Sequence, residues 1–391
     1  MKPRMYMRGR GDSLREQLNI ALVILHADPS RGGAERYTYD LAAALCREGQ
    51  AVSVLASDFA AVPPGVRAVK LPSRGATRLG RYLRFLDSLD AHLASENYDI
   101  VHAMLPVRRC DIYHPHAGIA AETIAAGGLL SRLGNRLNAR RHRFARVERE
   151  LLTGAAPPIV LCLSDYVRRS LLRYYALPPD RTATLFNAVD LERFNGGEHV
   201  GGGGALMIAQ DFERKGLAVA IRALARVPEC RLVVVGGDDP RRYLATANSL
   251  GVADRVQFAG RAQDPRPFYR AADFFVLPTK HDPCSLVVLE ALSLGVPVIS
   301  TRFNGACEIM EDGMHGFVLE DPTDVDGLAA AMQKLMEPAR RAAMSEACVQ
   351  LRPALSYPKH LEKLVEIYQA AIRAKSEIPN PKSQIPGGDS R

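Results

Sequence analysis

Residues 281–301, HDPCSLVVLEALSLGVPVIST, decide the fold of this chain. A loop with an acid, Asp282, is followed by leucines at every third position, which predicts a helix with one apolar face. Gly295 ends this helix, and Val296–Ile299 follows as a short buried strand. The backbone N–H groups at the helix start suit a phosphate. Glu290, on the same helix, suits a hydroxyl pair such as that of a ribose, and the alternative is an ordinary αβ unit with one surface acid.

The same alternation of apolar strands and helices extends along the chain in two series, which predicts two α/β domains with parallel sheets covered on both faces. The predicted strands are Asn19–Leu25, Ala51–Ala56, Asp99–His102, Asp111–His114, Ile159–Leu163, Ala205–Ala209, Arg231–Gly236, Val256–Phe258 and Phe274–Leu277. The predicted helices are Ala34–Arg47, Arg78–Ala94, Leu217–Val227, Pro240–Leu250 and Pro265–Ala271. Two open α/β domains place a ligand in the cleft between them, at the carboxyl ends of the strands.

Composition marks the boundaries between these units. A glycine-rich segment separates the two series and is flexible by composition, and both ends of the chain are polar or rich in proline and glycine. The predicted units are a disordered basic leader at 1–18, a first Rossmann-like domain at 19–195, a glycine linker at 196–204, a second domain at 205–358, a last helix at 359–373 and a disordered tail at 374–391.

Charge and composition narrow the class of protein. With 391 residues and 24% charged residues, the chain is typical of a soluble globular protein, and no uncharged apolar run reaches the roughly 18 residues of a membrane span. Residues 1–17 lack the apolar core of a secretory signal. Seven cysteines without Cys-x-x-Cys spacing predict a reducing cytoplasm, without a disulfide framework or zinc site. Residues 1–195 hold 28 basic against 19 acidic side chains, which predicts a polyanionic partner for the first domain.

Two loops that open helices carry candidate anion contacts. Gly32 and Gly33 follow the first strand, where backbone can approach a ligand closely and the helix dipole favours an anion. Arg214 and Lys215 precede the helix at Leu217–Val227, where two cations oppose the dipole unless they clamp an anion. Such cations lower the barrier to a reaction in which a phosphate departs, because negative charge develops on that phosphate. The alternative for this pair is a solvated charged turn.

The combination of these segments is similar to a known family. An acid, seven residues and a second acid, followed by Ala-Leu-x-x-Gly-x-Pro-Val-Ile-x-Thr, resembles the donor-site signature of family 4 glycosyltransferases of the GT-B fold. The Arg214-Lys215-Gly216 sequence occupies the place of the family's Arg-Lys-Gly motif. The resemblance extends from about Asn19 to Arg373 and is closest to the branch with lipopolysaccharide core glucosyltransferases. It implies two Rossmann-like domains facing a central cleft, and a last helix that crosses back to the first domain.

The resemblance also implies roles for individual residues. Asp282, where the family has Glu, would contact hydroxyls of the donor sugar beside Arg214 and Lys215. The remaining donor-binding residues implied are Gly32, Gly33, Arg261, Ser285, Leu286 and Glu290. The reaction implied is metal-independent, retaining transfer of a hexose from a UDP- or GDP-sugar, with no cofactor and with the leaving diphosphate able to accept the acceptor's proton.

The acceptor side is predicted around three histidines of the first domain. His114 and His116 point the same way in an extended chain, but no third ligand at fixed spacing indicates a metal. In the family a histidine near this place lies beside the reacting sugar, so His116 is the catalytic candidate and His102 the second, with a packed structural role as the alternative for both. Glu35 either complements the helix dipole or contacts acceptor.

An arginine-rich segment at 128–152 predicts a membrane contact. Arg132, Arg136, Arg140 and Arg143 recur every three or four residues among leucines, which is typical of a basic amphipathic helix on an anionic membrane. The alternative is a solvated arginine face. Nucleic acid is disfavoured, because Phe144 is the only aromatic residue within the arginine run. The expected location is therefore the cytoplasm, peripheral on the inner face of the cytoplasmic membrane.

These observations predict a retaining glycosyltransferase that acts on a hydroxyl of a glycan or glycolipid acceptor, in cell-envelope polysaccharide or lipopolysaccharide synthesis. One alternative is another GT-B enzyme, such as a nucleotide-sugar 2-epimerase, which would release free nucleotide and sugar without an acceptor. The other is a non-catalytic protein that binds anionic lipid, which would explain the arginines but not the second domain's motifs. The identities of the sugar, the nucleotide and the acceptor stay open.

Overall fold

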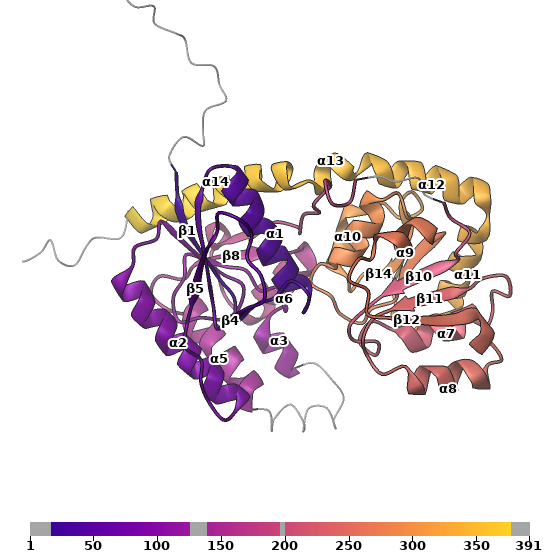
Figure 1. Ribbon diagram of the computed structural model, residues 1–391, viewed down its shortest axis with the longest axis horizontal. Helices are drawn as coiled ribbons and strands as arrows, with labels where there is room; N and C mark the ends of the chain where they lie inside the picture. Colours follow the sequence, from indigo (N-terminus) through magenta and orange to yellow (C-terminus); the bar gives the residue numbers. More distant parts are fainter. Residues whose placement is uncertain (1–16, 126–138, 196–199, 377–391) are drawn as a thin grey trace, which may run out of the picture.

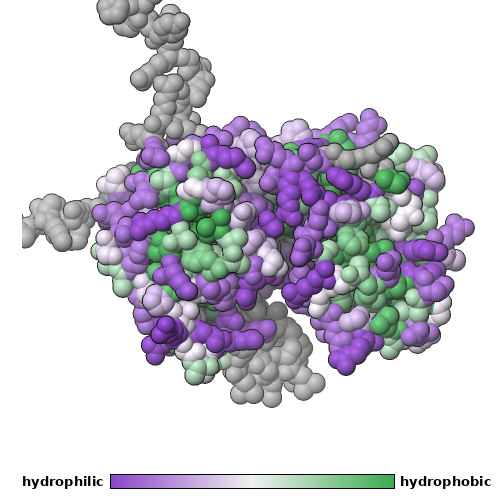
Figure 2. All heavy atoms as spheres, viewed as in Figure 1, coloured by the Kyte–Doolittle hydropathy of each residue, from purple (hydrophilic) through white to green (hydrophobic). Residues whose placement is uncertain are grey.

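The computed structural model describes residues 17–125, 139–195 and 200–376, which form two lobes that each contain a parallel β-sheet (Figure 1). Figure 2 shows hydrophilic side chains along the junction between the two lobes. The predicted fold class, two Rossmann-like open-sheet domains, is confirmed. The central strands of both sheets are apolar and buried, as expected for parallel sheets that helices cover on both faces, whereas the edge strands β5, β9, β12 and β15 are partly exposed.

The first domain has a seven-stranded sheet in the order β5-β3-β1-β6-β7-β8-β9. Its strands are β1 (Asn19–Val23), β3 (Ala51–Ala56), β5 (Arg67–Lys70), β6 (Ile100–Ala103), β7 (Ile112–Tyr113), β8 (Ile159–Cys162) and β9 (Thr182–Thr184), with β2 (His26–Ala27) and β4 (Asp58–Phe59) as a separate pair. Its helices are α1 (Gly33–Arg47), α2 (Arg78–Ser95), α3 (Ala120–Ala125), α5 (Ala139–Leu152) and α6 (Asp165–Tyr174), with the 3-10 turn η1 (Pro179–Arg181). One face of the sheet packs against α1 and the other against α2 and α5.

The second domain has a six-stranded sheet in the order β12-β11-β10-β13-β14-β15. Its strands are β10 (Ala205–Ile208), β11 (Leu232–Val235), β12 (Val256–Gly260), β13 (Phe274–Leu277), β14 (Val298–Thr301) and β15 (Gly316–Leu319). Its helices and 3-10 turns are α7 (Leu217–Leu224), α8 (Arg241–Ser249), η2 (Ala253–Arg255), α9 (Arg266–Ala271), α10 (Leu286–Ser293), η3 (Gly305–Ile309), α11 (Val325–Met336), α12 (Pro338–Gln350) and α13 (Arg352–Leu355).

Strand order in both sheets reverses next to the first strand of the domain. β1 pairs with β3 on one side and β6 on the other, and β10 pairs with β11 and β13 in the same way. A reversal of this kind opens a crevice at the carboxyl ends of the strands, where α/β proteins bind ligands. The loops after β1 and β10, which lead to Gly33 and Lys215, start at these two crevices.

The last helix, α14 (Tyr357–Ser376), returns to the first domain and lies along that lobe in Figure 1, whereas α12 and α13 lie along the second lobe. Leu361, Leu364 and Tyr368 belong to the apolar core that also contains α1 and β1. The Lys375 ammonium pairs with the Asp111 carboxylate at 2.6 Å. The apolar stripe of α14 therefore completes the first domain rather than the second.

The predicted glycine linker is ordered where it is described. The backbone N–H groups of Gly202 and Gly204 each donate to the buried Asp273 carboxylate at 2.9 Å. A Cβ added to Gly203 would lie 2.5 Å from the Ala271 carbonyl oxygen, so close packing on the second domain explains the glycines there. Residues 196–199 lie outside the described residues, as do the predicted leader up to residue 16 and the tail from 377.

No helix of the described residues is both long enough and apolar enough to cross a bilayer.

Candidate active site

The amino-terminal ends of α1 and α10 meet between the two domains. A Cβ added to Gly33, the first residue of α1, would lie 3.6 Å from the Leu286 Cδ1 atom, and Leu286 is the first residue of α10. Neither Gly32 nor Ser285, the residues that precede these helices, caps its helix through a side chain. Two helix ends, whose first N–H groups have no acceptor within the helix and whose dipoles point their positive ends outward, therefore converge from opposite domains, an arrangement that suits a diphosphate.

The Arg214–Lys215 loop enters this site from β10. Gly216 ends the loop with φ +82°, and a Cβ there would lie 2.1 Å from the Pro278 carbonyl oxygen, so glycine is required. The Arg214 Nη1 atom donates to the His281 carbonyl oxygen at 2.7 Å, and its Nε atom donates to Asp211 at 3.3 Å. Arg214 thus joins its own loop to the loop that carries Asp282.

Lys215 and Asp282 form a buried ion pair, in which the ammonium donates to the carboxylate and each residue is 8% exposed. Burial alone would raise the pKa of Asp282, but the charge and hydrogen bond of Lys215 and the charge of Arg214 hold it below the ordinary value. Burial lowers the pKa of Lys215 although Asp282 opposes this. The structure shows that Lys215 binds the Asp282 carboxylate, and the sugar contact predicted for Asp282 stays a prediction.

A hydrogen-bond framework holds the Asp282 loop against η3. The Asp282 N–H donates to the Phe303 carbonyl oxygen at 2.8 Å, and the Gly305 N–H donates to the Asp282 carbonyl oxygen at 2.9 Å. The Asn304 Oδ1 atom accepts from the Ser285 N–H at 3.2 Å. Asp282 and Ser285 are therefore positioned by residues about twenty positions later in the chain, on the far side of β14.

Glu290 is buried in α10 and bound by Tyr269 of α9. The Tyr269 hydroxyl donates to the Glu290 carboxylate at 2.8 Å, and burial raises the pKa of this carboxylate above its ordinary value. Arg193, just before the predicted linker, lowers this pKa, and Asp40 of α1 raises it. Glu290 therefore lies close to both residues. The sequence predicted Glu290 but gave Tyr269 no role, because no spacing rule relates a residue of α9 to one of α10.

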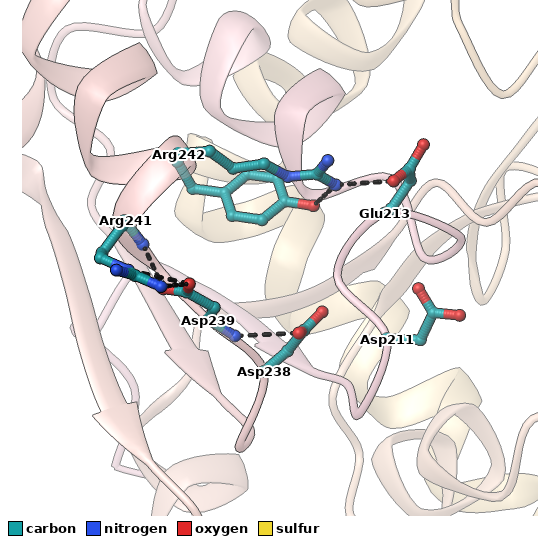
Figure 3. A pocket seen from close by; sticks show the side chains of 7 residues that line it. Asp211, Glu213, Asp238, Asp239, Arg241 and Arg242 are labelled. Atoms are coloured by element: carbon teal, nitrogen blue, oxygen red, sulfur yellow. Dashed lines mark hydrogen bonds and ion pairs between the residues drawn. The ribbon is translucent and has the colours of Figure 1, made fainter.

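Arg261 follows β12, and a cavity lies nearby at the carboxyl ends of β10 and β11. The exposed Arg261 lies against Gly237, where a Cβ would fall 2.0 Å from the Arg261 Nε atom. A cavity of about 580 Å³ in this region is lined by Asp211, Glu213, Asp238, Asp239, Arg241, Arg242 and Tyr243 (Figure 3). The Asp239 carboxylate accepts from Arg241, and Glu213 accepts from Arg242 at 3.0 Å. This cavity has more carboxylates than arginines, so the helix ends and Lys215 are the better phosphate site.

The three predicted acceptor-side histidines form one buried cluster with α14. His102 uses both ring nitrogens, Nδ1 with the Tyr368 hydroxyl at 2.7 Å and Nε2 with His114 Nδ1 at 3.1 Å. His102 and His114 are fully buried, and burial lowers the pKa of each well below its ordinary value. The predicted acceptor role of His102 is therefore corrected to a structural one, because neither ring nitrogen is left for a ligand.

His116 follows β7, and its ring lies against Tyr37 with centroids 4.5 Å apart. Burial, with a smaller contribution from His360, lowers the pKa of His116 to about 3. Its Nε2 atom is buried and has no hydrogen-bond partner among the described residues. Two residues later, Gly118 reaches the second domain, where a Cβ would lie 3.0 Å from His281 Nε2. The loop that carries His116 therefore meets the Asp282 loop.

Glu35 lies in the first turn of α1, and its pKa is raised by burial although its own backbone N–H and Arg31 oppose this. Its carboxylate lies 3.1 Å from the position of a Cβ on Gly32. Of its two predicted roles, this placement favours the one that complements the helix dipole.

The described part of the arginine segment is α5, and Arg132 and Arg136 lie outside the described residues. Arg140 and Arg143 are half-buried, and the Arg140 guanidinium lies 5.2 Å from the Phe144 ring centroid. Phe144 in turn stacks on Tyr82 of α2. Arg140 therefore extends the packed side of α5, and its membrane role stays a prediction.

The chain matches models of two glycosyltransferase families and is similar to known enzymes. Residues 31–193 match Glycosyltransferase Family 4, and residues 204–338 match the Glycosyl transferases group 1. The chain is 26% identical over 326 residues to the lipopolysaccharide glucosyltransferase WaaG of Escherichia coli (strain K12), covering 78% of this chain and 86% of WaaG. It is 27% identical over 425 residues to a D-inositol 3-phosphate glycosyltransferase of Thermobifida fusca (strain YX), covering 90% and 93%.

Solved structures agree on the fold. The crystal structure of WaaG superimposes with a TM-score of 0.77 at 24% identity, covering 89% of this chain and 99% of that one. Anabaena HepE in complex with UDP-glucose superimposes with a TM-score of 0.69 at 18% identity, covering 93% and 100%. The chain is therefore a glycosyltransferase of the GT-B fold, with a family 4 glycosyltransferase domain at 31–193 and a group 1 glycosyl transferase domain at 204–338.

Proposed function

We propose that this protein transfers a hexose, with retention of configuration and without a metal, from a nucleoside-diphosphate sugar to a hydroxyl of a glycan or glycolipid. The observation that carries the proposal is the convergence of the α1 and α10 amino termini beside the buried Lys215. Phosphate charge is stabilised at helix amino termini and by a fixed cation, and no metal is required for that.

In this reaction the diphosphate lies between Gly33 and the start of α10, with Lys215 beside its outer phosphate. An ammonium has three N–H donors, so Lys215 can keep Asp282 and bind a phosphate oxygen together. Glu290, oriented by the Tyr269 hydroxyl, accepts hydrogen bonds from the ribose hydroxyls. As the sugar–phosphate bond breaks, the leaving phosphate takes the acceptor's proton on the same face, which retains the configuration.

Cell-envelope polysaccharide or lipopolysaccharide synthesis is the proposed setting. Its support is the similarity to a lipopolysaccharide glucosyltransferase, together with the basic first domain. We propose a glycolipid acceptor at an anionic membrane surface, on the cytoplasmic side. The similarity to a D-inositol 3-phosphate glycosyltransferase makes a soluble phosphorylated polyol the second acceptor to test, beside the glycolipid.

A panel of UDP- and GDP-hexoses, tested first by thermal stabilisation of the purified protein, would test the donor. A true donor raises the melting temperature, because a ligand that binds only the native state stabilises it. Transfer is then followed with lipopolysaccharide core and inositol phosphate acceptors, and the anomeric configuration of the product is read by NMR. Stabilisation by no nucleotide sugar, or an inverted product, would contradict the proposal.

A further inference from the structure

The first turn of α6, in the first domain, is capped by a side chain of the second domain. The backbone N–H groups of Asp165 and Tyr166 donate to the two carboxylate oxygens of Glu308, at 2.7 and 2.6 Å. Ser164, which precedes the helix, donates its hydroxyl to the Pro283 carbonyl oxygen at 2.8 Å. The first turn of a helix has N–H groups without partners in the helix. Here Ser164 Oγ accepts from the Val167 N–H at 3.3 Å, and Glu308 of the other domain accepts from the two N–H groups before it.

Electrostatics favours this cap. A carboxylate at a helix amino terminus is stabilised by the macrodipole, and hydrogen bonds to an ionised acceptor are stronger than those between neutral groups. Arg169, one turn further along α6, lies 3.4 Å from the same Glu308 carboxylate. The Arg169 side chain is 67% exposed, so its ion pair with Glu308 contributes little, and the two backbone hydrogen bonds form the main part of the contact.

Glu308 belongs to η3, the segment that holds the Asp282 loop. A Cβ on Gly305 would lie 2.0 Å from the Pro283 carbonyl oxygen and 2.2 Å from Ser164 Oγ, so α6, η3 and the Asp282 loop are packed together at this point. A shift of α6 away from η3 therefore changes the surroundings of Asp282 directly.

Two further contacts between the domains flank the cap. The Tyr166 hydroxyl and His281 Nδ1 are 2.7 Å apart, and the Asn187 side-chain amide donates to the Cys284 carbonyl oxygen at 2.9 Å. His281 and Cys284 are the neighbours of Asp282 and Pro283 in the sequence. His281, Pro283 and Cys284 of the loop before α10 are thus bound from the first domain.

We propose that Glu308 is a positioning residue: its carboxylate caps α6 only when the domains are closed, and this contact fixes the loop that sets the Lys215–Asp282 pair. Opening the domains would expose the α6 amino terminus to water and release the loop from Ser164 and Tyr166. The consequence for catalysis rests on the proposed transfer reaction, whereas the capping contact itself does not.

Glu308→Ala and Glu308→Gln test the inference, with Glu311→Gln as the matched control on the same exposed segment. Loss of the cap should lower kcat for transfer about ten- to a hundredfold, because a small displacement of a catalytic group has an effect of this size. The fraction of donor hydrolysed should rise, since an open cleft admits water.

UDP affinity, measured by calorimetry, should change by less than about twofold. Glu308 contacts α6 and not the amino termini of α1 and α10, where the diphosphate is proposed to bind. Gln keeps one acceptor oxygen and should lie between Ala and wild type.

A second measurement does not depend on activity. Small-angle scattering with UDP bound should give a larger radius of gyration for Glu308→Ala than for wild type. The effects of Tyr166→Phe and Glu308→Ala should be less than additive, because both contacts belong to the same interface between α6 and the second domain. Wild-type kcat, hydrolysis and radius of gyration in a folded Glu308→Ala protein would overturn the inference. A wild-type protein that transfers no sugar would instead overturn the proposed function, and the scattering comparison would still decide on the cap.

Discussion

At the scale of single residues, Lys215 has two tasks that the sequence does not separate. It faces the proposed phosphate site, and it also neutralises the buried Asp282. Because the pKa of Asp282 lies below its ordinary value, its contribution to stability is complete above a pH of about 4. That contribution is lost as the pH falls through the lower pKa of the folded state.

Lys215→Ala is therefore expected to lower stability as well as turnover. Turnover should fall by about 10²–10³, because a contact with transition-state charge is lost. Stability should fall by about 3–5 kcal/mol, because the buried Asp282 carboxylate loses its partner. The double variant Lys215→Met with Asp282→Asn removes both charges and should recover most of the stability but none of the turnover. Denaturant unfolding and transfer assays check this, and an active double variant would contradict the role of Lys215.

Tyr269→Phe isolates the orientation of Glu290. The variant removes one hydroxyl that donates to the Glu290 carboxylate and keeps the ring that packs in the core. Loss of one hydrogen bond should weaken nucleotide binding about two- to tenfold, and Glu290→Ala should weaken it more. Calorimetry with UDP and GDP measures both. Unchanged affinity in Glu290→Ala would mean that Glu290 does not bind the ribose.

At the scale of elements, Arg140 belongs both to the side of α5 that packs against α2 and to the set of arginines predicted to face a membrane. Arg140 lies over Phe144, while Arg146 and Arg149 of α5 are exposed. Guanidinium groups can keep an aromatic contact and still face a surface, because the long side chain is amphipathic. The half-buried position of Arg140 therefore does not remove it from a lipid contact.

Changing Arg132, Arg136, Arg140 and Arg143 together to Gln should abolish binding to vesicles that contain anionic lipid. Each arginine near such a surface contributes about 1 kcal/mol, and added salt should weaken wild-type binding by screening. Nucleotide binding should be unchanged. The matched control removes four exposed arginines of the second domain: Arg222, Arg231, Arg241 and Arg340. Equal loss in the control would show that net charge, not this segment, determines binding.

At the scale of the whole molecule, Asp40 of α1 lies near the second domain, since its charge raises the pKa of Glu290 in α10. Burial raises its pKa to about 6, and Arg36, Arg193 and Asp190 are its charged neighbours. Because this pKa is higher in the folded protein than in the unfolded chain, the native state binds more protons between pH 4 and 6. Asp40 therefore costs stability increasingly as the pH rises through that window.

Asp40→Asn should accordingly stabilise the protein at pH 7.5 more than at pH 4.5. The difference should be about 1–3 kcal/mol, since one pKa unit corresponds to about 1.4 kcal/mol. Urea unfolding of wild type and variant at both pH values measures it, with the exposed Asp254→Asn as control. An equal effect of Asp40→Asn at both pH values would mean that the Asp40 carboxyl is not buried when the domains are closed.

The sequence by itself determined the fold class and the local positions of most phosphate-site residues. Apolar runs that alternate with segments of helical periodicity form parallel sheets. A glycine or a cation directly after such a strand lies at the carboxyl edge of the sheet, independently of how the other strands are ordered. Gly33, Lys215 and Glu290 could therefore be singled out, because each depends on its own strand–loop–helix unit.

Only the tertiary structure decided which of these residues are partners. Three interactions join segments from different units: the Lys215–Asp282 ion pair, the Tyr269–Glu290 hydrogen bond and the hydrogen bond between His102 and Tyr368 of α14. Helix α6, which the sequence analysis did not predict, supplies the contact with Glu308. Such contacts depend on how strands are ordered and domains close, and the periodicity of one segment contains no information about the distance to another.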